Sequence, residues 1–422
     1  MEKKIENMYI TSLYAKNIRR FKELNIKFNK GFNFIVGPNG SGKTSILRSL
    51  SMCLSTNFIE DTRFGEDSEI WTDVVYNCDK YRIGSAAGWV KTAAYRKSVV
   101  TPFTYHLPQT DFDRKALNSY QIDDHMPAYA PLFIGAYRKL DYHNIIGMTK
   151  EEAAQIQRVH YRENAVESLN GTIMPNVKQW LINRYFIIEK DWAEFERENW
   201  EWLLKNIECI GPVGSEFSFQ EVGRDLEPKF NLYGKETYLE ELSAGFQSVL
   251  SMILSIFEWI EGTNEGERIL VENAVGTVII DELDVHLHPE WQLTISNSLK
   301  RMFPKLQFIV TTHSPHVIAT AQSGEIIVIP SEDEINLKPS ERSYLGWNTD
   351  QILEDIMGVS SLENKEYAKL IDKIYKELDE GDLEEFKNTL NELEEIVHPN
   401  DTITSVLKIK LAEMHLKGDD EQ

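Results

Sequence analysis

The chain has 422 residues, of which 42% are hydrophobic and 27% charged, as is usual for a globular protein. Its formal net charge of -22 excludes a surface that coats nucleic acid everywhere, although a local basic patch is compatible with it. No apolar run reaches about 18 residues and the N-terminus lacks a signal-peptide core, so we expect neither membrane association nor secretion. Cys53, Cys78 and Cys209 form no CxxC pair, which fits a reducing cytoplasm.

The first 60 residues predict strands followed by a helix. Leu24, Ile26 and Phe28 alternate with polar residues, which is the period of a half-buried strand, and an apolar-periodic helix follows at about residues 43–54. The first 32 residues hold eight Lys/Arg against three Asp/Glu. This basic start is either an ordinary solvated face or a surface that faces DNA.

The segment GPNGSGKT joins this strand to this helix and matches the pattern GxxxxGK[ST] in the context that the pattern requires. Its glycines let backbone amides point into the loop, where they and the helix N-terminus bind phosphate. Lys43 is expected to reach the β- and γ-phosphates, and the Thr44 hydroxyl to ligate Mg²⁺. ATP and Mg²⁺ are therefore the predicted cofactors, and the residues expected to bind them are Gly37, Pro38, Asn39, Gly40, Ser41, Gly42, Lys43, Thr44 and Ser45.

Residues 61–235 give weaker signals, and we interpret them as an insertion of strands followed by helices. They carry no sustained heptads, which excludes the long coiled coil of a chromosome-maintenance protein. The segment RDLEPKF contains Asp225, Glu227 and Lys229, part of a nuclease-like pattern. The two acids are too close together and Pro228 would interrupt a central strand, so we predict no nuclease activity in this chain.

Two later strands end in polar residues. Asp281 and Glu282 follow the apolar run TVII, and His313 follows the run LQFIV. Ligands of open α/β sheets collect outside the carboxyl ends of strands. We expect Asp281 to hold Mg²⁺, Glu282 to polarise the attacking water and His313 to sense the γ-phosphate. An acid at a strand end can also be a simple helix cap.

Between these motifs, ELSAGFQSVL predicts a helix with Ser243 as its N-cap and one apolar face. By itself this is a structural cap, although the first amides of any helix can also bind an anion.

After residue 345 the chain becomes acidic and helical, with 17 acids against eight bases in the last 60 residues. Its apolar residues recur at helical spacing. They either cover the main domain or dock a partner. These residues are Tyr367, Leu370, Ile371, Ile374, Leu378, Leu383, Phe386, Leu390 and Leu393.

The motifs GPNGSGKT, LSAGFQ, VIIDE and VTTHS, in this order, resemble those of the ABC-class ATPases, including the branch of chromosome-maintenance, DNA-repair and OLD proteins. The resemblance implies an α/β fold: a P-loop ABC-type ATPase head with a mixed sheet, a helical insertion and a C-terminal helical appendage. It implies two subunits that sandwich two ATP molecules. Ser243 and Gly245 would then contact the γ-phosphate held by the other subunit, and residues 284–288 would cross the dimer interface.

The chain departs from the transporter motif LSGGQ at Ala244 and Phe246, which argues against a transporter. The glutamine loop of the family has no clear counterpart, and Tyr137 and Arg138 in FIGAYRKL are its candidates. We expect the ATPase lobe at residues 1–60 and 236–345, the insertion at 61–235 and the helical region at 346–422.

A compact head with an acidic helical tail is similar to the ATPase subunits of Septu-type and retron-associated anti-phage systems, the PtuA family. This resemblance implies a homodimer or higher homo-oligomer that regulates a separate HNH-type nuclease subunit, with DNA or a retron RNA/DNA hybrid as a further partner. One alternative is an autonomous DNA-repair or DNA-clamping ATPase. Another is a regulator of a reverse transcriptase or toxin.

Overall fold

The computed structural model describes residues 5–55, 64–88, 106–138, 140, 142–173, 175–264, 269–330, 332, 334–359, 365–398 and 401–419. The chain forms two compact units, Met1–Gly358 and Val359–Gln422. Among the helices of the described ranges, none is long and apolar enough to cross a membrane.

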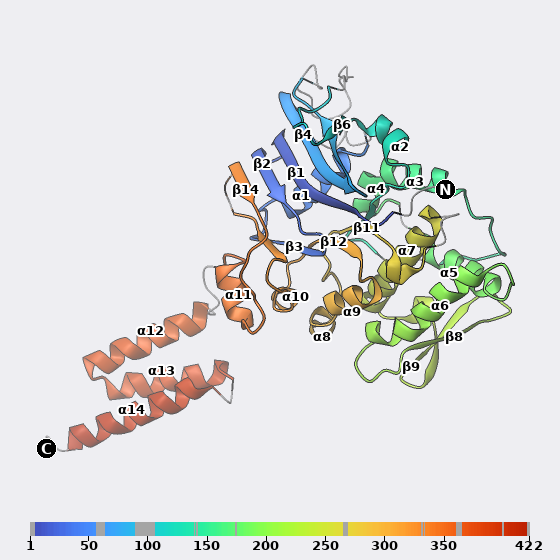
Figure 1. Ribbon diagram of the computed structural model, residues 1–422. Helices are drawn as coiled ribbons and strands as arrows, with labels where there is room; N and C mark the ends of the chain where they lie inside the picture. The colour runs from blue at the N-terminus through green and yellow to red at the C-terminus, as the bar shows by residue number, and fades with distance from the viewer. Residues whose placement is uncertain are drawn as a thin grey trace. The chain divides into compact units, whose positions relative to one another are not determined.

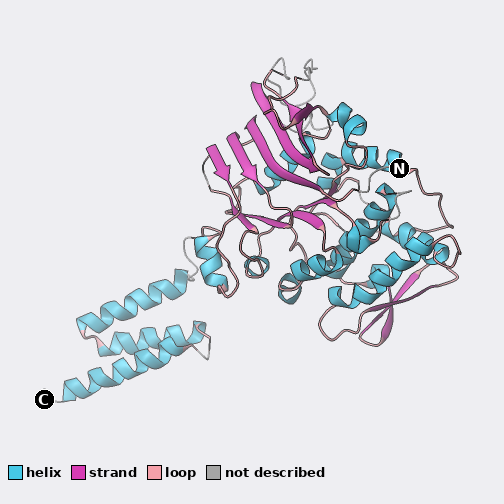
Figure 2. Cartoon of the chain, in the orientation of Figure 1, coloured by secondary structure: helices cyan, strands magenta, loops and turns pink. Residues whose placement is uncertain are grey.

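A parallel sheet of five strands, in the order β13-β3-β12-β11-β7, forms the centre of the larger unit (Figure 2). All of its neighbouring pairs are parallel, so the strands end along one edge. β3, β11 and β12 are buried at every position, as their continuous apolar runs predict. The strands are β3 (Phe32–Val36), β7 (Leu132–Ile134), β11 (Gly276–Ile280), β12 (Leu306–Thr311) and β13 (Ile326–Val328).

A second sheet, in the order β14-β2-β1-β4-β5-β6, lies beside the first (Figure 1). It is mixed, because β14 and β6 pair in parallel and the other strands pair antiparallel. One apolar core joins it to Ile35, Ile279 and Ile309 of the parallel strands. Its strands are β1 (Met8–Ile18), β2 (Phe21–Lys27), β4 (Phe64–Tyr76), β5 (Asp79–Ser85), β6 (Lys115–Leu117) and β14 (Glu334–Leu337).

Helices cover the other face of the parallel sheet, where residues such as Phe34, Val278 and Ile280 share a core with α7 (Ala244–Thr263). The Trp259 indole of α7 donates to the Ala130 carbonyl at 2.8 Å. A three-stranded sheet lies on this side too. It contains β8 (Ser218–Val222), β9 (Pro228–Leu232) and β10 (Lys235–Tyr238).

The remaining helices of the larger unit are short or medium in length. They are α1 (Lys43–Met52), α2 (Ile122–His125), α3 (Ala154–Glu163), α4 (Ala165–Leu169), α5 (Val177–Ile187), α6 (Glu194–Asn206), α8 (Pro289–Gln292), α9 (Ile295–Met302), α10 (Pro315–Ile318) and α11 (Thr349–Asp355).

The range 61–235 is not a separate insertion throughout. β4 pairs with β1 along its length, and β7 is an edge strand of the parallel sheet next to β11. The sequence did not reveal β7 because three residues are too few to show a period. The helical part of the range, from α3 to α6, agrees with the expectation of helices after strands.

The smaller unit contains α12 (Lys365–Glu380), α13 (Leu383–Ile396) and α14 (Thr402–Asp419). The apolar stripes of α12 and α13 face a core of their own, which consists of Ile374, Phe386, Leu390, Leu393 and Leu407. The stripes therefore pack on one another, because three amphipathic helices can bury each other's apolar faces. The division lies at residues 358/359 and leaves α11 in the larger unit, beyond the expected start of the helical region at 346.

Candidate nucleotide-binding site

The predicted phosphate loop connects β3 to α1. The Lys43 ammonium group donates to the carbonyls of Gly37 at 2.8 Å and Pro38 at 3.0 Å, so the loop curls around it. Gly42 has φ of 96°, and a Cβ there would lie 2.8 Å from the Phe21 ring. The turn between β1 and β2 therefore requires glycine at this position.

Asp281 follows β11 and meets the phosphate loop. The Thr44 hydroxyl donates to Asp281 Oδ1 at 3.3 Å, and the Thr311 hydroxyl at the end of β12 donates to the same oxygen at 2.6 Å. The Asp281 side chain is buried. The structure thus brings together the two residues predicted to ligate Mg²⁺, from segments 237 positions apart.

Glu282 has φ of 51°, a left-handed conformation that is uncommon for glutamate. Its N–H donates to the Thr311 hydroxyl at 2.7 Å. Arg138 holds the other side of this backbone: its guanidinium donates to the carbonyls of Asp281 and of Glu282, the latter at 2.7 Å, and to Gly135 at 2.7 Å. Arg138 is therefore part of the site through its contacts with the backbone of the two acids.

The Arg138 guanidinium is almost fully buried, and this desolvation lowers its pKa to about 10. The charges of Asp281, Asp284 and Glu282 act in the opposite direction. Arg138 consequently remains protonated at neutral pH, as a guanidinium that donates to two backbone carbonyls must.

His313 follows β12 and is placed by Asp284. Its N–H donates to Asp284 Oδ1 at 3.1 Å, and the Thr312 hydroxyl donates to the same oxygen at 2.6 Å. Burial and the nearby Lys43 charge lower the pKa of the His313 side chain below its ordinary value. The imidazole is therefore neutral at pH 7, with one ring nitrogen able to donate and the other to accept.

The Lys43 ammonium group is also desolvated, which lowers its pKa to about 8. Asp281, Glu282 and Asp284 oppose this effect. A bound phosphate would add further negative charge and raise this pKa again.

Ser243 caps α7, as predicted, with its hydroxyl accepting from the Phe246 N–H at 3.4 Å, and it is exposed. Gly245 is buried against the His286 carbonyl, and a Cβ at this position would clash with that backbone. Packing on the loop 284–288 is thus one reason for glycine here. The contact of Ser243 and Gly245 with a second subunit's nucleotide stays a prediction.

Two residues that act at the site were not predicted. Arg20, in the turn between β1 and β2, donates to the Gly40 carbonyl of the phosphate loop at 3.0 Å. Thr311 hydrogen-bonds both Asp281 and the Glu282 backbone. The basic turn was the available signal for Arg20, but it was interpreted as a surface for DNA. Nothing in the local sequence distinguishes Thr311 from an ordinary strand residue.

The residues present fit ATP with Mg²⁺. The Ser41 hydroxyl in the loop is buried without a hydrogen-bond partner, and the space where a Gly40 Cβ would lie is open. A hydroxyl and a carboxylate, Thr44 and Asp281, are adjacent hard oxygen donors. Mg²⁺ binds through one or two such groups together with phosphate oxygens and water.

Residues 9–335 match the family model described as RecF/RecN/SMC N terminal domain. The chain belongs to this family. It is 26% identical over 416 residues to the Septu protein PtuA of Bacillus thuringiensis, covering 96% of this chain and 98% of that protein. It is 33% identical over 140 residues to the retron Ec83 probable ATPase of Escherichia coli, covering 33% of this chain but 25% of that protein.

A second Septu protein PtuA, from Bacillus mycoides, is 24% identical over 82% of this chain, which spans 44% of that relative's length. The SMC head domain from Thermotoga maritima, a solved structure, is 15% identical with a TM-score of 0.39, covering 79% of this chain and 99% of that domain. The resemblance to Septu and retron-associated ATPases expected from the motifs is confirmed.

The lowered pKa of Lys43 predicts a pH-dependent affinity for ATP. Because the free ammonium group loses its proton above pH 8 and the bound group retains it, ATP affinity should fall about tenfold from pH 7 to pH 9. Calorimetry at pH 8.5 should show proton uptake on binding. In Lys43→Arg the guanidinium stays charged, so this pH dependence should disappear. A wild-type affinity that is flat across this range would contradict the prediction.

Arg138 is predicted to be a positioning residue. Arg138→Met should leave the Kd for ATP within about threefold but slow hydrolysis about 100-fold, because a small displacement of Glu282 misaligns the water. Arg138→Lys, which keeps the charge, should recover part of the rate. Arg158→Met, which removes a hydrogen bond to the Thr263 carbonyl, is the control. Steady-state kcat and KM separate the two effects, and an unchanged kcat in Arg138→Met would refute the role.

Proposed function

We propose that this chain is the ATP-binding and ATP-hydrolysing switch subunit of a bacterial anti-phage defence complex. The observation that carries the ATPase assignment is the hydrogen bond between Thr44 of the phosphate loop and Asp281 of the acidic strand end, with Glu282 and His313 adjacent in sequence to the same strand ends. The similarity to Septu protein PtuA over almost the whole chain supports the defence role.

In this proposal the phosphate loop and Lys43 bind the β- and γ-phosphates, and Thr44 and Asp281 hold Mg²⁺. Bound Mg²⁺ would neutralise charge on the phosphates during transfer. Glu282 accepts a hydrogen bond from water and orients it. The neutral His313 imidazole donates to the γ-phosphate level of the site without adding a competing charge.

Dimerisation around ATP follows from the placement of the serine helix. α7 presents Ser243 and free first-turn amides at an exposed helix N-terminus, where a phosphate is favoured. Gly245 packs on the loop 284–288, which directly follows Asp281 and Glu282. A γ-phosphate bridging two subunits would favour the closed arrangement, and its loss on hydrolysis would release it.

The proposed effector is a separate HNH-type nuclease subunit. Because the apolar stripes of α12–α14 are used internally, docking would rely on what remains outside. Four large apolar side chains of this unit are exposed, namely Tyr375, Ile396, Val406 and Ile409. The basic β1–β2 hairpin is the proposed surface for DNA or a retron RNA/DNA hybrid. A cytoplasmic location is part of the proposal, and Cys53, Cys78 and Cys209 are free thiols.

The second candidate is an autonomous DNA-repair ATPase. It is favoured by 39% identity over 83 residues to the DNA replication and repair protein RecF of Lachnospira eligens, covering 18% of this chain. Mass spectrometry of proteins that co-purify with the chain from its native host discriminates the two: a nuclease subunit supports the defence complex, and its absence supports the repair ATPase.

Two substitutions test the ATP-closed dimer. Glu282→Gln should bind ATP, hydrolyse it at least about 100-fold more slowly and accumulate as a dimer, because the water is no longer polarised. Ser243→Arg should bind ATP and remain monomeric, because the large cation fills the cap position that meets the other subunit's nucleotide. Light scattering with and without ATP measures both. Normal turnover in Glu282→Gln, or an ATP-dependent dimer of Ser243→Arg, would refute the corresponding assignment. Ser218→Arg on β8 is the control.

Removal of residues 359–422 tests the docking proposal. The larger unit has its own cores, so the shortened chain should still bind ATP. The nuclease should no longer co-purify with it. Retention of the nuclease at the full-length ratio would exclude the helical unit as the docking element.

A further inference from the structure

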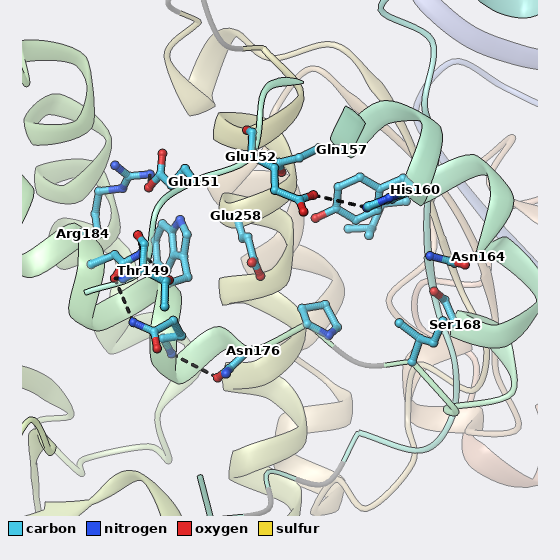
Figure 3. A pocket seen from close by; sticks show the side chains of 18 of the residues that line it. Thr149, Glu151, Glu152, Gln157, His160, Asn164, Ser168, Asn176, Arg184 and Glu258 are labelled. Atoms are coloured by element: carbon cyan, nitrogen blue, oxygen red, sulfur yellow. Dashed lines mark hydrogen bonds and ion pairs between the residues drawn. The ribbon is translucent and has the colours of Figure 1, made fainter. Parts of the chain in front are cut away.

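A cavity of about 410 Å³ lies beside α7 in the larger unit (Figure 3). Its walls come from the loop at residues 149–152 and from α3, α4, α5 and α7. No residue assigned to the nucleotide site lines it. The volume lies in the range of small-molecule sites, and the walls combine apolar surface with a few polar groups, as such sites do.

Glu258 projects from α7 into the middle of this cavity, between the residues labelled around it in Figure 3. Its Oε2 atom is buried without a hydrogen-bond partner. A buried carboxylate oxygen that accepts no hydrogen bond is costly, and most such atoms in proteins are paired. A ligand that brings a donor into the cavity would satisfy it.

The charge around the cavity favours a cation. Glu151 and Glu152 are exposed at its edge and add two carboxylates to Glu258. Arg184 is committed to Glu261 at 2.6 Å and to Glu151 at 3.3 Å. Lys150 is exposed at the rim.

The apolar wall suits a ligand with a hydrocarbon part. Trp180 and Tyr161 line the cavity, with Leu132 and Ile173 beside them. Aromatic faces attract ammonium groups and pack well against methylene chains. Within the described residues, no group of three or more His, Cys, Asp or Glu side chains could hold a bare metal ion.

We propose that this cavity binds a small aliphatic amine, with an ammonium group donating to Glu258 and the methylene chain packed against Trp180 and Tyr161. The carboxylates at the edge would hold a second ammonium group of a diamine or polyamine. Anionic metabolites are rejected by the same three carboxylates.

The titration of Glu258 sets the pH dependence of binding. Burial, then the charges of Glu151 and Glu261, raise its pKa to about 7, and Arg184 acts against them. Tyr161, whose own pKa is raised by burial and by Glu258, remains a neutral phenol. An ammonium ligand prefers the ionised carboxylate, so binding is stronger at pH 8 than at pH 6, where Glu258 is mostly protonated.

The test is calorimetry and thermal unfolding of the full-length protein with 1,5-diaminopentane and with spermidine, using 1,5-pentanediol as the uncharged control. We expect both amines, but not the diol, to bind at pH 8 and to raise Tm. Glu258→Gln, which has the same shape, should weaken binding at least tenfold. Glu189→Gln, which removes an exposed carboxylate outside the cavity, should bind as the wild type does.

Ile173→Trp is a second variant, in case Glu258→Gln does not fold. Ile173 is 42% exposed and lines the cavity, so a larger side chain there narrows the space without disturbing the core and should also weaken binding. The proposal is overturned if the wild type binds neither amine, if Glu258→Gln or Ile173→Trp binds as tightly as the wild type, or if MgCl₂ alone gives the same rise in Tm.

Discussion

The parallel pairing of β12 with both β3 and β11 is the constraint on which the nucleotide site depends. In register, Val310 lies opposite Phe34 on one side and Ile280 on the other, so all three strands end at one level. Thr311 therefore lies between the phosphate loop and the acids and hydrogen-bonds both Asp281 and the Glu282 backbone. A shift of one residue would turn every side chain of β12 to the opposite face and separate these groups.

This arrangement concentrates charge in a poorly solvated place, which explains the titration behaviour of the site. Lys43, Asp281 and Arg138 are all buried, and each is held by hydrogen bonds from neighbouring backbone or side chains. A buried ion that loses its partners is strongly destabilising, so the network keeps its members in place. The low dielectric also strengthens the interaction with an incoming phosphate. Arg138 has a particular part, because it holds the carbonyl of a residue in a left-handed conformation that would otherwise relax.

Features encoded by contiguous residues could be predicted from the sequence, whereas those created by tertiary pairing could not. The strand, loop and helix around Lys43 carry their own signals in glycine spacing and apolar period, and the structure contains all three as expected. β7 is three residues long and becomes a strand through its pairing with β11. Arg138 owes its place to that pairing, so the sequence showed it as a candidate without a contact. The stripes of α12 and α13 were visible, but not that they face each other, because periodicity identifies an apolar face and not what covers it.

α7 connects features that the sequence presents as unrelated. At its start Gly245 touches the loop that follows Glu282, and four turns later Glu258 projects into the cavity while Trp259 holds the Ala130 carbonyl just before β7. The helix is buried along most of its 20 residues and has no proline or unpaired turn at which it could bend. A displacement imposed at Glu258 would therefore reach Gly245 as a shift of the whole helix, since close-packed interiors transmit strain and do not absorb it. The cap residue Ser243 and the acid-bearing loop would then move together, which makes α7 the physical route by which an occupied cavity would alter closure of the nucleotide site.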